Sequence, residues 1–519
     1  WPAMGHSLWG DEDWAFSDYV HGHWKPKKGS NWQGPLKFSQ VSWTQTIFGD
    51  QQGNNHWLSS ILQRQSLRLW RELEGHRPWE FDETVMRLVP LLAGLGGLVV
   101  LALFLRSLGR PLEGLVAAFF MEFHPLHVRF STEARGYSLM LLMMVLALWM
   151  AWRCVKTGRL SDWLAFGLAQ WLVMIAWKGA LYPLAFLNVL MLAVLLNRAR
   201  GGGVEHRRQL SRWVAANLIG AMLFLPFGVT SQLQVRRSID QVRHRARPMG
   251  WVWAANTISE TLMGMPWKEE DPTNPREVSL ERQIRNSPMS VLLPIGIGSM
   301  LSLGLWRLWR RDRLLAGFCL AICLSAVAAA AHFKFVVRVE LLPWYLLYCL
   351  PAWAILAAAA VSPDDAWMAG RPAWLRLGGA CAGLVFFAGF ESPMDRVLRR
   401  YPKEDFRGAW EVSRGRHEPR DFSGESRVRT AWLWRRGEAY DPRGDLKVRD
   451  SAALRRKVAE ARAAGEEFYM IVGYRELGEL LCPDLLKELD ESGEFDRVAT
   501  LWGEEALNTL TVYRLKPNR

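Results

Sequence analysis

The sequence has few cysteines and lacks the motifs of several common protein classes. Six cysteines occur in 519 residues, five of them in or beside apolar runs, and only Cys482 lies in polar sequence. The polar parts therefore offer no pair for a disulfide framework, and no C-x-x-C or His-rich spacing marks a structural zinc site. The C-terminal part also lacks G-x-G-x-x-G and G-x-x-x-x-G-K-[ST], so we assign it no nucleotide.

The positive charge of the chain is unevenly distributed. The formal net charge is +13, yet residues 391–519 contain 25 Lys and Arg against 25 Asp and Glu, so the whole excess lies in residues 1–390. In a soluble protein such an excess would predict binding to nucleic-acid phosphates. Here membrane topology accounts for much of it, and we expect no nucleic-acid partner.

Long apolar runs fill the middle of the chain. Half of the residues are hydrophobic, and between Leu88 and Phe390 they form runs close to the ~20 residues that cross a bilayer core. A single soluble globular domain is excluded. We predict an α-helical multi-pass membrane domain over 88–390, flanked by polar segments 1–87 and 391–519. Ten spans are expected, at 88–108, 112–130, 136–152, 162–177, 179–196, 213–231, 289–309, 314–331, 341–361 and 374–390.

The basic residues of the short loops predict the orientation. Five loops on one side contain 16 Lys and Arg, whereas three on the other contain 5. Basic loops stay in the cytoplasm, so both ends of the chain and the loop 232–288 are expected to face outward from an inner (plasma) membrane. Because the chain begins at Trp1 in an outward segment, we expect either a cleaved signal or a preceding helix, which would make eleven spans.

The two outward segments differ in pattern. Residues 1–87 are rich in Trp, His and Gly, and we expect short helices that lie against the membrane surface. Residues 391–519 predict a small α/β domain, with helices over 451–464 and 475–492 and strands over 468–473 and 509–515.

Three consecutive acids, Asp11, Glu12 and Asp13, stand between Trp9 and Trp14 at the expected membrane edge. A solvated polar turn is one interpretation of this cluster. A carboxylate at the edge of a low-dielectric cavity can instead act as a general base on a hydroxyl. The third interpretation is a divalent cation held by Asp11 and Asp13.

Three further outward segments contain polar residues with more than one interpretation. Glu133 and Arg135, near Tyr137, either cap a helix or serve a site, because charges at membrane depth are costly. His56, after Asn55, is either a hydrogen-bonded structural residue or part of that site. Arg338 either anchors a helix end or joins them. Because all four segments are expected on one face of the membrane, we predict that they line one cavity.

Several of these segments together resemble a known family. Trp9-Gly10-Asp11-Glu12, Asn55-His56, the run from Pro125 to Tyr137 with Ser-Thr-Glu-Ala-Arg-Gly-Tyr at its end, and the run 401–409 are similar to the multi-pass glycosyltransferases with a C-type fold. The protein mannosyltransferase and aminoarabinose transferase group is the most similar. The resemblance extends along most of the membrane part and, more loosely, to Arg338 with Pro351.

This resemblance implies a sugar donor linked to a polyprenyl or dolichyl phosphate and a transfer that inverts the anomeric centre. Asp11 matches the acidic position that acts as base, and Glu12 supports it. Asn55, His56, Glu133 and Tyr137 would bind substrate. No cofactor is required, although Asp13 and the nearby His21 and His23 leave a metal-assisted variant open. The acceptor, whether a protein, a lipid or a glycan, is not implied.

Transfer from a lipid phosphate releases an anion, which requires positive charge arranged in advance. Arginine suits this role because its planar guanidinium group can donate two parallel hydrogen bonds to two phosphate oxygens. The outward candidates are Arg338, Arg135, Lys178, and Arg236 and Arg237 in a cluster that extends to Arg247, with interfacial anchoring as the alternative role. We rank Arg135 lower because Glu133 is expected to neutralise it.

Two other functions remain open. A transporter or flippase would use the same intramembrane charges to bind a solute, although no inverted repeat is visible. A non-catalytic scaffold would make the acidic triplet dispensable.

Overall fold

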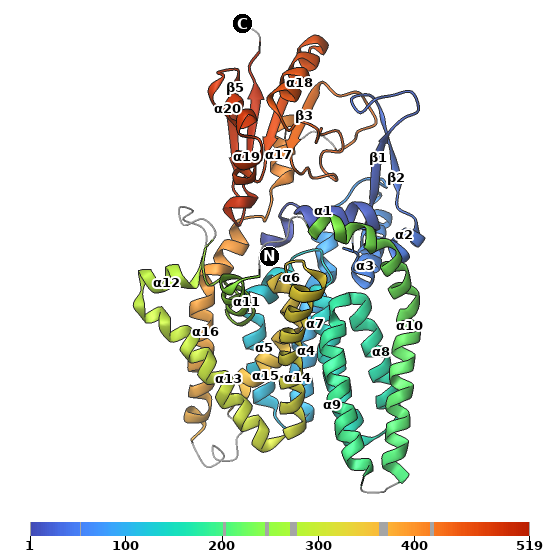
Figure 1. Cartoon of the computed structure of the whole chain (residues 1–519), viewed down its shortest axis with the longest axis vertical. Helices are drawn as coiled ribbons and strands as arrows, with labels where there is room; N and C mark the ends of the chain where they lie inside the picture. The colour runs from blue at the N-terminus through green and yellow to red at the C-terminus, as the bar shows by residue number, and fades with distance from the viewer. Residues whose placement is uncertain are drawn as a thin grey trace.

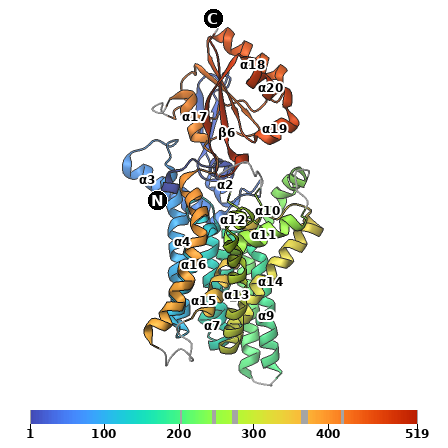
Figure 2. The same cartoon turned by 90° about the vertical axis from the view of Figure 1, so that its left-hand side faces the viewer.

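The structure is a computed structural model that describes residues 2–51, 53–200, 204–243, 249–269, 278–362, 372–415 and 420–517. A bundle of long helices forms one half of the molecule, and a smaller α/β domain stands at one end of it (Figure 1). The N-terminal segment lies where the two halves meet, and the view in Figure 2 shows the same stacking from the side. The predicted fold class is confirmed.

Among the described residues, seven helical segments are long and apolar enough to cross a membrane. A 20-residue helix spans about 30 Å, the thickness of the hydrocarbon core. The seven segments are Glu83–Ser107 (α4), Tyr137–Thr157 (α7), Lys178–Ala199 (mostly α9, Leu181–Ala199), Arg207–Val235 (within α10, Val204–Arg243), Pro288–Arg311 (mostly α13, Leu292–Arg311), Arg313–Val337 (mostly α14, Arg313–His332) and Pro343–Ala360 (ending in α15, Leu350–Ala360).

The remaining expected spans are shorter or broken. Helix α8 (Leu160–Ala176) and the stretch Gly378–Gly389 inside α16 (Ala373–Arg400) are apolar but below the length of the seven. The expected span 112–130 is two helices, α5 (Pro111–Glu122) and α6 (Pro125–Ser131). Pro125 begins α6, and the His124 side chain caps it by accepting a bond from the Leu126 N–H at 3.3 Å. A proline cannot continue the preceding helix, so the chain turns there.

Helix α15 is the centre of the bundle, since every residue from Leu350 to Ala360 is buried. Helix α13 packs against it at Gly304, where an added Cβ would overlap the Leu356 carbonyl. Two helices, α11 (Trp251–Met263) and α12 (Leu280–Asn286), lie in the predicted outward loop. Helix α16 continues to Arg400, past the domain boundary predicted at residue 391.

The N-terminal segment contains the predicted short helices and one hairpin that was not predicted. Its helices are η1 (Pro2–Gly5), α1 (Gly10–Ala15), η2 (Phe16–Val20), α2 (Trp43–Phe48) and the longer α3 (Trp57–Glu74). Strands β1 (Gly22–Pro26) and β2 (Leu36–Gln40) pair antiparallel, with Gly22 opposite Gln40. Gly22 has φ +136°, and a side chain there would overlap the β2 backbone.

The C-terminal domain has a four-stranded sheet in the order β3-β4-β6-β5. Its strands are β3 (Val428–Leu433), β4 (Glu467–Val472), β5 (Phe495–Leu501) and β6 (Leu510–Leu515). Strands β3 and β4 are parallel, and the other pairs are antiparallel. Parallel neighbours need a crossover, which α18 (Ser451–Ala464) provides with Asp450 as its N-cap.

The predicted helix 451–464 and the strands β4 and β6 are confirmed. The predicted helix 475–492 is instead two helices, α19 (Arg475–Leu481) and α20 (Pro483–Glu491), because Pro483 interrupts it. Strands β3 and β5 and the helix α17 (Phe406–Arg414) were not predicted.

Candidate active site

The three acids of the N-terminal motif lie on helix α1, between the helical bundle and the C-terminal domain (Figure 1). Their side chains have different surroundings. Asp11 keeps 33% of its side chain exposed, whereas Glu12 and Asp13 are buried. The sequence groups the three acids, and the fold gives each a separate set of partners.

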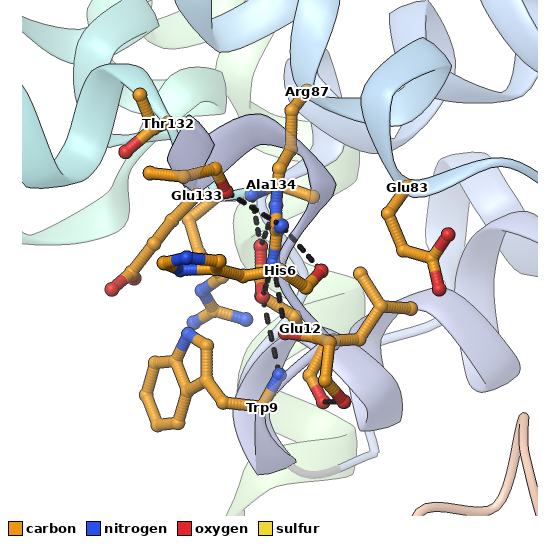
Figure 3. Close-up of polar contacts among 12 residues, drawn as sticks. His6, Trp9, Glu12, Glu83, Arg87, Thr132, Glu133 and Ala134 are labelled. Atoms are coloured by element: carbon orange, nitrogen blue, oxygen red, sulfur yellow. Dashed lines mark hydrogen bonds and ion pairs between the residues drawn. The ribbon is translucent and has the colours of Figure 1, made fainter. Parts of the chain in front are cut away.

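Glu12 forms an ion pair with Arg87 of α4, and Figure 3 shows the two side chains directed at each other. One Glu12 oxygen accepts bonds from Arg87 Nη2 at 2.6 Å and from the Trp9 N–H at 3.2 Å. The other accepts from Arg87 Nε at 3.2 Å and from the Ala134 N–H. Arg87 also binds the carbonyl oxygens of Ala3, Met4, His6 and Ser7. Glu12 therefore fixes the motif against α4 and the segment around Ala134.

Asp13 binds the C-terminal domain. Its two oxygens accept bonds from the Glu438 N–H at 2.7 Å and the Ala439 N–H at 2.8 Å. Burial raises the pKa of Asp13 to about 7, although the two backbone bonds oppose the rise. The residue thus joins α1 to the segment that follows β3.

Asp11 lies among three cations. Arg435, just after β3, donates from Nη2 to Asp11 Oδ1 at 3.2 Å, and Arg135 donates to the Asp11 carbonyl at 3.0 Å. Burial raises the pKa of Asp11, but the positive charges of Arg435, Arg135 and Lys403 outweigh burial and hold the pKa below its ordinary value. The carboxylate is ionised at neutral pH and partly accessible, as a general base must be.

Arg135 connects the predicted residues to one another. Its guanidinium donates to Asn54 Oδ1 and to His56 Nε2, the latter at 3.1 Å, and lies 5.9 Å from the Tyr137 ring centroid. His56 Nδ1 lies 3.1 Å from the Ala176 carbonyl. Burial and the nearby Arg135 and Lys178 charges lower the pKa of His56 well below its ordinary value. His56 is therefore neutral, with Nδ1 donating to the carbonyl and Nε2 accepting from Arg135.

The structure pairs Glu133 with a different arginine from the one expected. Its Oε1 accepts from Arg129 Nε at 2.9 Å, and Arg129 also binds Glu504 of the C-terminal domain at 3.1 Å. The contact described between Glu133 and Arg135 is a backbone bond, from the Arg135 N–H to the Glu133 carbonyl at 2.7 Å, and the Glu133 carboxylate is paired with Arg129 instead. Arg135 remains available as a positive charge beside Asp11.

Two other predicted residues hold the first outward segment in place. The Asn55 amide donates to the Thr46 and Gly49 carbonyls at 3.1 and 2.6 Å. Lys178 forms an ion pair with the buried Asp50. Both are engaged with partners other than Asp11.

The remaining predicted cations do not join this cluster. Arg338 is exposed and has left-handed backbone angles, φ 58° and ψ 40°, at the end of the short π-helix η5 (Phe333–Val337). Its side chain makes no contact with Asp11 or Arg135 in the described part of the chain. The side chains of Arg236, Arg237 and Arg243, and the whole of Arg245 and Arg247, lie outside the described residues.

In the described ranges, no three His, Cys, Asp or Glu side chains are arranged to hold a metal ion. The oxygens of Asp13 accept two backbone bonds, and an Asp11 oxygen is bound to Arg435. The two acids proposed to share a cation are thus bound to other partners.

A small pocket lies beside the motif, between the bundle and the C-terminal domain. Its lining includes Trp9, Arg87, Arg129, Thr132 and Lys403 but does not include Asp11. A second small pocket shares Thr132 with it and is also lined by Leu95, which is 48% exposed on α4.

Sequence reasoning missed the contribution of the C-terminal domain. Arg435, Lys403 and Glu404 all lie at the motif, and Lys403 Nζ is 3.6 Å from the Trp9 ring centroid. Lys403 and Glu404 belong to the run 401–409 that carries the resemblance, which was the one available signal for them. Arg435 follows a strand that was not predicted, and nothing in its local sequence indicates the contact.

Comparisons with known proteins bear on the membrane part. Residues 79–229 match the family model of dolichyl-phosphate-mannose-protein mannosyltransferases, which confirms the resemblance over those residues. No curated protein sequence matches the chain. Among solved structures, ArnT from Cupriavidus metallidurans bound to undecaprenyl phosphate aligns at 15% identity over 99% of this chain and 96% of that one, with a TM-score of 0.48. The apo state of the same protein aligns at 14% identity with the same coverage and score.

Proposed function

We propose that the chain is a membrane glycosyltransferase that moves a sugar from a polyprenyl-phosphate donor to an acceptor hydroxyl, with Asp11 as the general base. One observation carries this proposal: the partly exposed Asp11 carboxylate lies beside Arg135 and Arg435 where the helical bundle meets the C-terminal domain. The mannosyltransferase family match over residues 79–229 supports the reaction class.

The proposed reaction is a single displacement. The acceptor oxygen attacks the anomeric carbon and forms the new glycosidic bond, while Asp11 takes the hydroxyl proton. The bond from the anomeric carbon to the phosphate oxygen breaks, and its electron pair leaves with the polyprenyl phosphate. Attack from the side opposite the leaving group inverts the anomeric centre.

Positive charge beside the base suits this leaving group. The released phosphate is anionic, so it needs cations fixed in place before the reaction and no proton donor. Arg135 is held by Asn54 and His56 next to Asp11, and we propose that it faces the donor phosphate, with Arg338 as a second ligand. Glu12 supports Asp11 by fixing α1 to Arg87.

We further propose that both soluble parts face the exterior or periplasm of an inner membrane, as the basic loops predict. The acceptor hydroxyl would reach Asp11 from that side, and the lipid donor from the bilayer. A cofactor is not part of the proposed reaction.

The test compares purified Asp11→Asn with wild type. Undecaprenyl-phosphate-linked mannose and aminoarabinose serve as donors, and a membrane extract supplies acceptors. Release of undecaprenyl phosphate is measured because this product is common to all sugars. We expect Asp11→Asn to lose roughly 10²-fold or more of the rate, as is typical for a removed general base.

Asp18→Asn is the matched control, because Asp18 belongs to the same segment and binds His23 at 3.1 Å instead of facing Arg135. It should keep the wild-type rate. Wild-type turnover by Asp11→Asn would remove Asp11 as base. Movement of the intact donor across the membrane without release of undecaprenyl phosphate would indicate a flippase.

A further inference from the structure

The C-terminal domain places one charged side chain on the proposed base. Arg435 lies two residues beyond the end of β3 and donates to Asp11 Oδ1 at 3.2 Å. The pair is partly buried: the Arg435 side chain is 15% exposed and the Asp11 side chain 33%. Among the described residues, this is the hydrogen bond that a side chain donates to the Asp11 carboxylate. Arg135 and Asn54 donate instead to the Asp11 backbone carbonyl.

Four features hold Arg435 in this position. Trp434, the preceding residue, has a left-handed backbone with φ 72°, a conformation that costs an ordinary residue about 1 kcal/mol or more. The guanidinium lies 4.1 Å from the Trp14 ring centroid and 3.9 Å from the buried Glu404. The fourth is Gly10, where an added Cβ would overlap the guanidinium.

Glu404 connects this arrangement to both halves of the molecule. One of its oxygens accepts from the Gly10 N–H at 2.7 Å, and the other accepts from the Tyr474 hydroxyl at 2.9 Å. Tyr474 follows β4 and, like Trp434, has a positive φ, here 48°. Because β3 and β4 are parallel neighbours, their carboxyl ends meet at one edge of the sheet, and that edge faces α1.

We propose that Arg435 is a positioning residue for catalysis, which binds and orients the Asp11 carboxylate, so that the active site is complete only when the C-terminal domain is docked on α1. This inference rests on the proposed role of Asp11 as base. Without Arg435 the carboxylate would lose its side-chain partner while its backbone stays bound to Arg135.

The size of the effect depends on the charges that face Asp11 from every side. An opposite charge within about 4–6 Å lowers a carboxyl pKa by roughly 1–3 units. Arg135 and Lys403 remain when Arg435 is removed, so part of the lowering of the Asp11 pKa persists against the effect of burial. We therefore expect the pKa of Asp11 to rise by roughly one to two units. The groups that face Asp11 or its arginine are Arg435, Arg135, Lys403, Glu404, Tyr137, Tyr345 and Tyr474.

The experiment measures kcat/KM for donor turnover from pH 3 to 9 in the full-length protein. In wild type the acid limb, where the rate falls because Asp11 is protonated, lies below about pH 4, because the pKa of Asp11 is below its ordinary value of 3.8. Arg435→Ala should move this acid limb upward by roughly one to two pH units. Arg435→Lys retains a positive charge and should keep the acid limb near the wild-type pH. Its maximal kcat/KM should be lower, because the planar guanidinium group is lost. Gly10→Ala should shift the limb like Arg435→Ala by displacing the guanidinium.

Arg436→Ala is the control, because Arg436 binds the Gly444 carbonyl and lies near Trp32 instead of Asp11. The acid limb of the Arg436→Ala profile should lie at the same pH as that of wild type. A loss of rate in Arg435→Ala that is equal at every pH, with an unmoved limb, would overturn the proposal and leave Arg435 a structural residue. Asp11→Asn is measured in parallel. If Asp11→Asn is inactive and the acid limb of Arg435→Ala does not move, only this inference is refuted. If Asp11→Asn is fully active, the proposed function itself is refuted.

Discussion

Replacement of Glu12 by glutamine tests the division of roles inside the acidic motif. Glu12 is 1% exposed, and its ion-pair partner Arg87 is buried with it. Two N–H groups converge on each Glu12 oxygen. A glutamine amide would place an NH₂ group against one of these pairs, so two buried donors would lose their acceptor in either orientation of the amide.

The magnitude follows from these contacts. A buried donor without an acceptor costs about 1–3 kcal/mol, and removing one partner from a buried ion pair typically costs about 3–5 kcal/mol. We therefore expect Glu12→Gln to lower the free energy of unfolding by about 3–5 kcal/mol. Glu72→Gln is the control, because the Arg68–Glu72 pair is also close, at 2.7 Å, but about 60% exposed. Such surface pairs contribute about 1 kcal/mol or less.

The assay is denaturant unfolding of the purified protein in detergent, followed by tryptophan fluorescence. Glu12→Gln should unfold at clearly lower denaturant than wild type, and Glu72→Gln close to wild type. Equal stability of the two variants would refute the assignment of Glu12 to holding the motif. It would also leave the position of α1 without the anchor described above.

Three further predictions follow from other contacts. The bonds of His23 to Asp18 and Glu438 raise its pKa from 6.5 to about 9. The stabilisation from this residue is therefore complete below pH 6.5 and is lost as the pH rises through 9. His23→Gln should flatten the pH dependence of the free energy of unfolding between these two pH values, and an unchanged dependence would contradict the pairing. Arg338→Ala should weaken binding of undecaprenyl phosphate roughly tenfold if the side chain binds phosphate, whereas wild-type affinity would assign it to anchoring. Chelation with EDTA should leave donor turnover unchanged, and a loss restored by Mg²⁺ or Mn²⁺ would establish the metal-assisted variant.

The sequence predicted the parts of the site that depend on topology. Asp11, His56 and Arg135 are far apart in the chain, but their loops were expected on one side of the membrane, and the structure brings Arg135 into contact with both of the others. Periodicity and capping also predicted α18, where Asp450 accepts from the Ala453 N–H at 2.7 Å. Membrane crossings and helix caps are local rules, so one sequence suffices to apply them.

The contacts that were not predicted are long-range and specific to side chains. Glu133 and Arg135 are close in sequence, yet the Glu133 carboxylate pairs with Arg129 of α6, just before the turn that contains Glu133. Lys178 pairs with Asp50, an acid that no local pattern singled out. Arg435 reaches Asp11 across more than four hundred residues, and only the docking of the β3–β4 edge on α1 brings them together.

Donor turnover in sealed vesicles tests the central claim most directly. Wild type and the Asp11→Asn and Asp18→Asn variants are reconstituted so that the C-terminal domain faces outward, and the undecaprenyl-phosphate-linked sugars and acceptor extract are added outside. We predict release of undecaprenyl phosphate by wild type and Asp18→Asn and almost none by Asp11→Asn. Equal release by all three proteins would contradict the account.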